Sequence, residues 1–161
     1  MFCIATYKRS DDEPDEGEQP SDTSAFFHTA GIGLVRACVA HEDGTSHLVL
    51  QGVARVNLRS FIQEKPFLIA EIRELWPAVG DPDELDVLSR KLREKCSQMK
   101  IPDAKMREKL NEQLAQITDP SVLGDLLAHT FLQDPYQQQD VLEERNIGKR
   151  LRMILKHLGS K

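Results

Sequence analysis

Residues 47–77, HLVLQGVARVNLRSFIQEKPFLIAEIRELWP, decide the fold class of the first half of the chain. In residues 48–58 every even-numbered position is apolar or small, whereas the odd-numbered positions include Gln51, Arg55 and Asn57. This period of two is typical of a β-strand with one face in the core and the other in water. We therefore predict a half-buried strand whose even-numbered side chains share the buried face.

The same alternation resumes after Pro66 and predicts a second strand, with Leu68, Ala70, Ile72 and Trp76 on one side. Gly52 indicates a bulge or a close backbone approach within the first of these two strands. Residues 1–7 and 31–40 are rich in β-forming residues and predict two further strands. Asp43-Gly44 is a hairpin turn signal between residues 31–40 and 47–58. The first half is thus expected to be an antiparallel meander of at least four strands.

Beyond Gly80 the apolar period becomes helical. Asp-Pro steps at Asp81, Asp119 and Asp134 each supply an N-cap and a first-turn proline, and Asn146 can cap a last helix. The apolar stripes are Leu85, Leu88, Leu92, Cys96 and Met99; Met106, Leu110, Leu114 and Ile117; Val122, Leu123, Leu126, Leu127 and Phe131; Val141 and Leu142; and Ile147, Leu151, Ile154, Leu155 and Leu158. We predict an α+β chain with a β-rich lobe over residues 1–80 and a helical lobe over 81–161.

Charge is unevenly distributed along the 161 residues, whose net charge is -5. Seven acids and no base lie in residues 11–22, so residues 10–24 are predicted to form a disordered acidic loop. No apolar run approaches the roughly 20 residues that span a bilayer, which excludes a membrane protein. The chain opens without a basic segment followed by an apolar one, and its three cysteines are unpatterned. These features predict a cytoplasmic protein with reduced thiols.

The order of several short motifs resembles the LON substrate-binding domain, the amino-terminal module of Lon-type ATP-dependent proteases, which also occurs as a free-standing protein. The motifs are Gly33-Leu34-Val35-Arg36-Ala37, Asp43-Gly44, residues 48–56 (LVLQGVARV), Pro66-Phe67-Leu68-Ile69-Ala70, Asp119-Pro120 through Leu126-Leu127-Ala128, Gln139-Asp140-Val141-Leu142-Glu143 and Arg150-Leu151. The family's opening strands, ahead of the one that resembles residues 2–5, have no counterpart here. The β lobe is therefore expected to have an open edge that invites pairing with another chain.

What the resemblance implies is a PUA-like antiparallel β-barrel lobe, incomplete in this chain, followed by a helical bundle lobe. It also implies a non-catalytic module that captures unfolded or tagged polypeptides, with a separate ATP-dependent protease as a further partner. The sequence lacks the Gly-x-x-x-x-Gly-Lys-Ser/Thr loop that cradles phosphates. We accordingly predict no catalytic residue and no cofactor.

Aromatic side chains near the predicted loops and strand edges are the candidates for polypeptide contact, because contiguous exposed apolar area marks interaction sites. They are Phe26, Phe27, Phe61, Phe67, Trp76 and Tyr136. Each taken alone fits a core position better than a contact position, and only as a group are they the candidates.

An RNA-binding PUA-like protein is the alternative, with Lys149, Arg150, Arg152 and Lys156 on the last helix as phosphate contacts. Cations near a helix C-terminus also complement its dipole, and aromatic residues that could stack on bases are scarce around this helix. Nucleic acid is therefore the less favoured partner.

Cys38 and His41 have the spacing of half a metal site, but a structural zinc ion takes four ligands. His47 is expected on a strand, and no second cysteine is near in the sequence. A buried thiol at Cys38 is the simpler interpretation, and no metal site is predicted.

Overall fold

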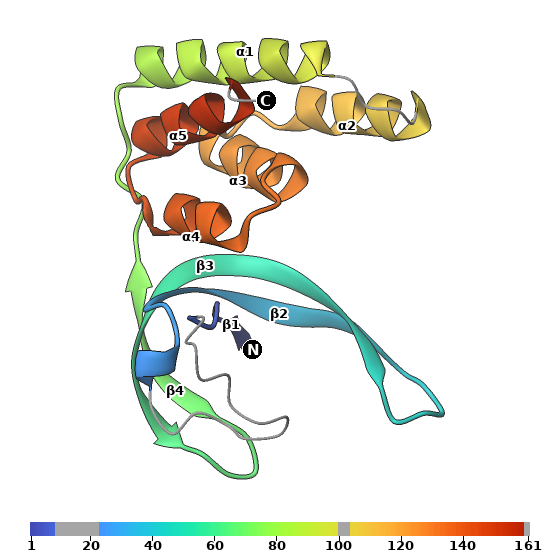
Figure 1. Ribbon diagram of the computed structural model, residues 1–161, viewed down its shortest axis with the longest axis vertical. Coiled ribbons are helices and arrows are strands. Elements are labelled where there is room, and N and C mark those ends of the chain that lie inside the picture. Colours follow the sequence, from blue (N-terminus) through green and yellow to red (C-terminus); the bar gives the residue numbers. More distant parts are fainter. Residues whose placement is uncertain (9–22, 100–103, 160–161) are drawn as a thin grey trace. The chain divides into compact units, whose positions relative to one another are not determined.

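The computed structural model describes residues 1–8, 23–99 and 104–159, and it divides into two compact units, Met1–Trp76 and Pro77–Lys161 (Figure 1). The first unit contains β1 (Phe2–Ile4), the 3-10 helix η1 (Thr23–Ala25), β2 (Thr29–Ala40), β3 (Ser46–Gln63) and β4 (Ile69–Leu75). The second contains α1 (Pro82–Gln98), α2 (Ala104–Gln116), α3 (Pro120–Phe131), α4 (Pro135–Glu143) and α5 (Ile147–Gly159). The predicted α+β class is confirmed.

The four strands form one antiparallel sheet in the order β1-β2-β3-β4, as the predicted meander requires. Asp43 and Gly44 lie in the turn between β2 and β3, with Gly44 at φ +83°. Of the predicted disordered loop, residues 10–22 lie outside the described residues. Thr23 and Ser24, at its end, belong to η1 instead, so the loop prediction was wrong for these two residues.

A bulge in β3 overturns the prediction that all even-numbered side chains of residues 48–58 share one face. Ile32 pairs with Ala54 and Gly33 pairs with Gly52, which leaves Val53 as an extra residue. An extra residue reverses the alternation beyond it, because side chains along a strand have a period of two. Val56 is buried with the core, whereas the even positions before the bulge lie on the opposite face.

The close backbone approach suggested for Gly52 occurs across from it, at Gly33. A Cβ atom at Gly33 would lie 2.9 Å from the carbonyl oxygen of Gln51. At Gly52 a Cβ would meet nothing within 4 Å. Glycine is therefore required on β2, at the position that faces the bulge.

The core of the first unit is small. Its buried residues are Ala30, Val56 and Leu58, flanked by the half-buried Ala5, Phe26, Ile32 and Ala70. Ile72 and Trp76, expected on the buried side of β4, are exposed, Trp76 by 67 % of its surface. The sheet therefore buries only the part of β2 and β3 that lies between β1 and β4.

The helices of the second unit begin where the capping signals predict. The side chains of Asp81, Asp119 and Asp134 accept hydrogen bonds from backbone N–H groups two residues ahead, at 3.2, 2.7 and 3.0 Å. Asn146 accepts from the Lys149 N–H at 2.9 Å. The buried core is Leu85, Leu88, Leu92, Cys96, Leu110, Leu114, Leu123, Leu127, Ala128, Leu132, Val141, Ile147, Leu151, Ile154 and Leu158. The predicted stripes supply most of it, whereas Val122, expected inward, is exposed.

Candidate polypeptide-binding surface

The outer part of the β2–β3 hairpin projects beyond the strands that flank it (Figure 1). β1 pairs with β2 only from Gly31 to Gly33, and β4 pairs with β3 only from Arg55 onward. Residues 34–50 therefore form a two-stranded ribbon, which we call the arm. A ribbon of two strands is marginally stable in water without something packed against it.

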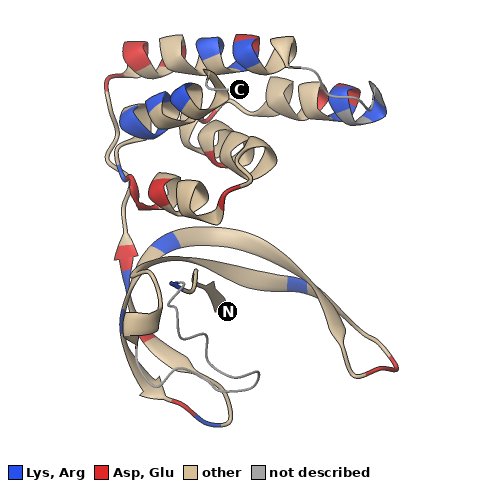
Figure 2. Ribbon diagram, viewed as in Figure 1, with Lys and Arg blue, Asp and Glu red and all other residues tan. Residues whose placement is uncertain are grey.

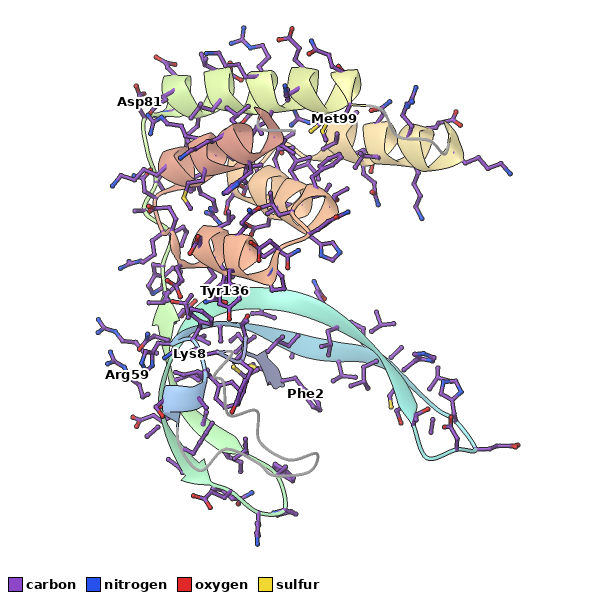
Figure 3. All side chains as sticks on the ribbon, in the orientation of Figure 1. Phe2, Lys8, Arg59, Asp81, Met99 and Tyr136 are labelled. Atoms are coloured by element: carbon purple, nitrogen blue, oxygen red, sulfur yellow. The ribbon has the colours of Figure 1, made fainter. Side chains whose placement is uncertain are left out.

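Apolar side chains cover both faces of the arm. Pairs that face each other across the ladder share a face, so the register assigns each residue to one side. Leu34, Ala37, Val39 and Val49 lie on the face that continues from the core, and Val35, Cys38, Leu48 and Leu50 lie on the opposite one. Cys38 is exposed, so the prediction of a buried thiol there was wrong, because no described element covers this part of β2. Side chains stand off both sides of this ribbon in Figure 3.

The larger of these side chains are exposed to water. Leu34, Val35, Val39, Leu48 and Val49 keep from 36 % to 59 % of their surface accessible. Charged residues of the arm are confined to Arg36, which donates to the Gln51 side chain at 2.6 Å, and to the acids of the turn (Figure 2). Contiguous exposed apolar area of this kind marks an interaction surface, whereas single exposed apolar residues do not.

The arm also offers unpaired strand edges. Over residues 34–40, β2 has no strand partner on the side away from β3 among the residues that the structure describes. An edge strand presents a row of backbone N–H and C=O groups to which an extended chain can add. The arm thus combines hydrogen-bonding backbone with apolar side chains.

The structure separates the aromatic residues that the sequence singled out within the first unit. Phe26 packs edge-on against Tyr7 and Phe61, with ring centroids 5.5 and 6.0 Å apart. Phe27 is half-buried, with the Lys8 ammonium 5.9 Å from its ring centre. Phe26 packs against the small core, and its edge-on contacts with Tyr7 and Phe61 help to keep these rings half-buried.

The remaining three aromatic candidates are exposed. Phe67 and Trp76 lie beyond opposite ends of β4. Tyr136 lies at the start of α4 in the second unit (Figure 3). The first unit therefore does not gather its aromatic candidates into one patch. The arm does gather its aliphatic residues, and the signal for it in the sequence is that residues 34–35 and 48–50 are apolar at odd and even positions alike.

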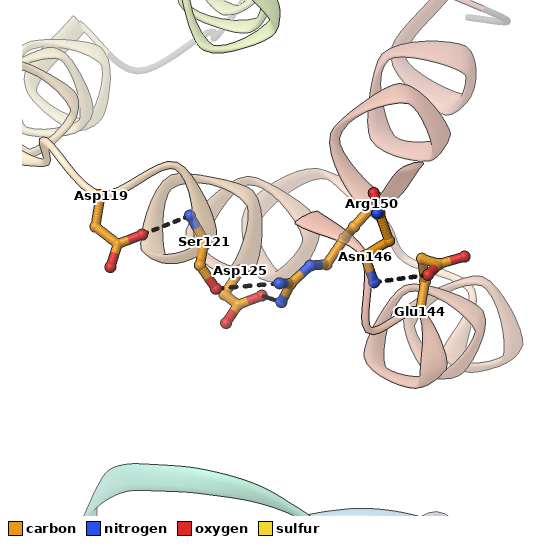
Figure 4. A network of polar contacts seen from close by, with 6 residues as sticks. All are labelled: Asp119, Ser121, Asp125, Glu144, Asn146 and Arg150. Carbon is orange, nitrogen blue, oxygen red and sulfur yellow. Dashed lines mark hydrogen bonds and ion pairs between the residues drawn. The ribbon is translucent and has the colours of Figure 1, made fainter. Parts of the chain in front are cut away.

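The basic helix α5 does not present its four candidate cations together. Arg150 is 1 % exposed, and its guanidinium donates to Asp125 at 2.9 Å and to the Ser121 hydroxyl at 3.1 Å (Figure 4). Arg152 forms an ion pair with Glu84 of α1. Arg150 therefore holds α5 against α3 and is withdrawn from the surface. Lys149 and Lys156 remain exposed.

The described residues contain neither a metal-binding cluster nor a helix that could span a membrane. No group of three or more His, Cys, Asp or Glu side chains is placed to hold a metal ion in residues 1–8, 23–99 and 104–159. None of the helices that the structure describes has the length and hydropathy to cross a membrane.

The family model of the ATP-dependent protease La (LON) substrate-binding domain matches residues 1–160. The chain belongs to the LON substrate-binding domain family. This domain is the non-catalytic part of the protease, and the predicted resemblance is confirmed.

Solved structures of Lon N-terminal domains have a similar fold. The N-terminal domain of the Mycobacterium avium complex Lon protease matches with a TM-score of 0.68 and 20% identity, over 84% of this chain and 72% of that one.

A Lon N-terminal domain protein from Xanthomonas campestris matches with a TM-score of 0.56 and 17% identity, over 81% of this chain and 68% of that one. Lon protease 2 of Desulfotalea psychrophila is 23% identical over 98% of this chain and 20% of its own length. The Lon protease of Anaeromyxobacter dehalogenans is 28% identical over 100% of this chain and 18% of its own length. The chain spans about a fifth of the length of the Lon proteases it matches.

Proposed function

We propose that this LON domain captures extended, apolar segments of non-native polypeptides on its β2–β3 arm. The observation that supports the proposal is the presence of exposed apolar side chains on both faces of a strand pair with an unpaired edge. The family model supports it independently, since it describes a substrate-binding domain of a protease.

In the proposed mechanism a client segment adds as a strand along residues 34–40 of β2. Its backbone hydrogen-bonds to the free edge whatever its sequence, and its alternate side chains pack against the apolar residues on either face. Binding is therefore tolerant of sequence but selects for extended, apolar chain. It is also weak, because ordering a flexible client offsets much of the contact energy.

Such a client exposes an apolar segment either because it is unfolded or because it carries an apolar tag. We include delivery to a separate ATP-dependent protease in the proposal, because the matched relatives are Lon proteases. The arm itself contributes the capture step only.

The test compares Val49→Glu on the arm with Val122→Glu on α3. Both valines are exposed, by 59 % and 50 %, so neither charge disturbs a core. Affinity for reduced, carboxymethylated lactalbumin is measured by fluorescence anisotropy. We expect Val49→Glu to weaken binding by at least about tenfold. The lost apolar contact alone reduces the binding free energy by roughly 1–2 kcal/mol, and burying the new charge beside the client reduces it further. Val122→Glu should bind as the unmodified chain does.

Equal affinity of Val49→Glu and the unmodified chain would refute capture by the arm. Amide hydrogen exchange provides a second readout, because strand addition protects backbone groups. Exchange over residues 34–40 should slow when the lactalbumin is bound. Protection restricted to the second unit would place the binding surface elsewhere.

A further inference from the structure

The arm ends in a turn that holds two histidines beside each other. The His41 N–H donates to the Thr45 carbonyl at 2.8 Å, and the Gly44 N–H donates to the His41 carbonyl at 3.1 Å. The hydroxyl and the N–H of Thr45 donate to the Asp43 carboxylate at 2.7 and 2.9 Å and lower the pKa of that group. These contacts fix the width of the turn, and with it the separation of His41 and His47.

The imidazole rings approach each other directly across this turn. His47 pairs with Val39 in the ladder, so His47 and His41 are diagonal neighbours on one face. Nε2 of His41 lies 2.5 Å from Nδ1 of His47, with ring centroids 4.5 Å apart and the ring planes at 87°. Both side chains are exposed, so the space around the two nitrogens is open to water.

We propose that His41 and His47 form a binding site for a divalent transition-metal ion of the kind that prefers imidazole, namely Zn²⁺, Cu²⁺ or Ni²⁺. Two imidazole nitrogens on one tetrahedral ion, each at about 2.05 Å from it, are about 3.3 Å apart. In the pair as described one of these nitrogens donates its hydrogen to the other, so metal binding requires that ring to carry its hydrogen on its other nitrogen. The 2.5 Å separation also has to widen by roughly 0.8 Å, which small rotations of two exposed side chains accomplish.

The protein supplies two of the ligands, and water completes the coordination sphere. The described residues place no third His, Cys, Asp or Glu close enough to form a larger group. The Asp43 carboxylate is engaged by Thr45, and Cys38 lies on the opposite face of the arm. Such a site is exchangeable, unlike a structural zinc site with four protein ligands. Affinity should follow the general order for nitrogen ligands, with Cu²⁺ above Ni²⁺ and Zn²⁺.

The test is a titration of the full chain with zinc chloride by isothermal calorimetry and with copper(II) chloride by NMR. We expect one Zn²⁺ per chain, and substoichiometric Cu²⁺ should broaden the imidazole signals of His41 and His47 before those of the other three histidines. His41→Ala and His47→Ala should each weaken zinc binding by at least about tenfold. Even the loss of a residue that only hydrogen-bonds to a metal ligand weakens metal affinity by about that factor. His129→Ala removes a single exposed histidine of α3 and should leave the affinity unchanged.

Simultaneous broadening of all five histidines would show adventitious binding and overturn the proposal. Unchanged zinc affinity in His41→Ala or in His47→Ala would also overturn it. Far-ultraviolet circular dichroism confirms that each variant is folded. Failure of this site leaves polypeptide capture by the arm untouched, because the two experiments use different variants and probes.

Discussion

Asp125→Ala should destabilise the helical unit more than Arg150→Met does, although Arg150 is the buried partner of the pair. Arg150 is 1 % exposed, whereas the side chain of Asp125 keeps 44% of its surface in water. Removing the carboxylate takes the charge of Asp125 away from a buried guanidinium. Removing the guanidinium leaves a carboxylate that water can solvate. The two losses are therefore unequal.

The magnitudes follow from this asymmetry. Asp125→Ala should cost about 3 kcal/mol, the lower end for breaking a buried pair, because the Ser121 hydroxyl still accepts from Arg150. Arg150→Met keeps most of the volume of the arginine stem and should cost about 1 kcal/mol. The double variant should be about as stable as Arg150→Met alone. Adding Arg150→Met to Asp125→Ala should therefore raise the free energy of unfolding by roughly 2 kcal/mol.

Urea unfolding followed by circular dichroism in the helix band measures these differences. The signal reports the second unit, because the described residues of the first unit contain only the 3-10 turn η1 as helix. A difference of about 2 kcal/mol shifts the midpoint by roughly 1 M urea. The reasoning is refuted if Arg150→Met is as destabilising as Asp125→Ala, or if the double variant shows the sum of the two losses.

Three further experiments test the packing. Leu92→Ala, at a fully buried position of α1, should lower the free energy of unfolding by about 2–5 kcal/mol, and a loss below 1 kcal/mol in urea unfolding would contradict the described core. Gly33→Ala should lower the free energy of unfolding of the first unit by about 1–3 kcal/mol, which faster amide exchange in β2 and β3 would reveal. Gly52→Ala should leave this exchange nearly unchanged, because a Cβ there meets nothing. Burial raises the pKa of Cys96 to about 11, so iodoacetamide at mildly alkaline pH should label the exposed Cys38 and spare Cys96 in peptide mass spectra.

The helical unit could be predicted from sequence because its signals are local. Each Asp-Pro step fixes a helix start within a few residues, and the hydrogen bond from Ser121 to Asp119 needs no distant partner. The apolar stripes then identify the buried face. Val122 was misplaced because the apolar stretch around Leu123 is wider than the face that α3 buries. The buried ion pair of Arg150 was missed because Asp125 lies 25 residues away in the chain.

The sheet was predictable in strand number and order but not in the facing of its side chains. A bulge depends on how two strands are paired, and the sequence of β3 alone does not show that Val53 is the extra residue. The aromatic candidates failed to form one patch for a similar reason. Phe26 and Phe61 are distant in sequence, and only the folded sheet brings their rings together.

The bulge at Val53 also explains how one strand serves two purposes. From Ala54 to Leu58, the even-numbered side chains of β3 face the core, and Val56 is fully buried there. Before the bulge the even-numbered side chains of β3 lie on the opposite face of the sheet, so Leu48 does not pack in that core. Val49, of odd parity, lies on the side that continues from the core, but no described element covers it. An uninterrupted strand would direct all the even-numbered apolar residues of 48–58 to one face, whereas the bulge places Leu48 and Leu50 on the face opposite to Val56 and Leu58.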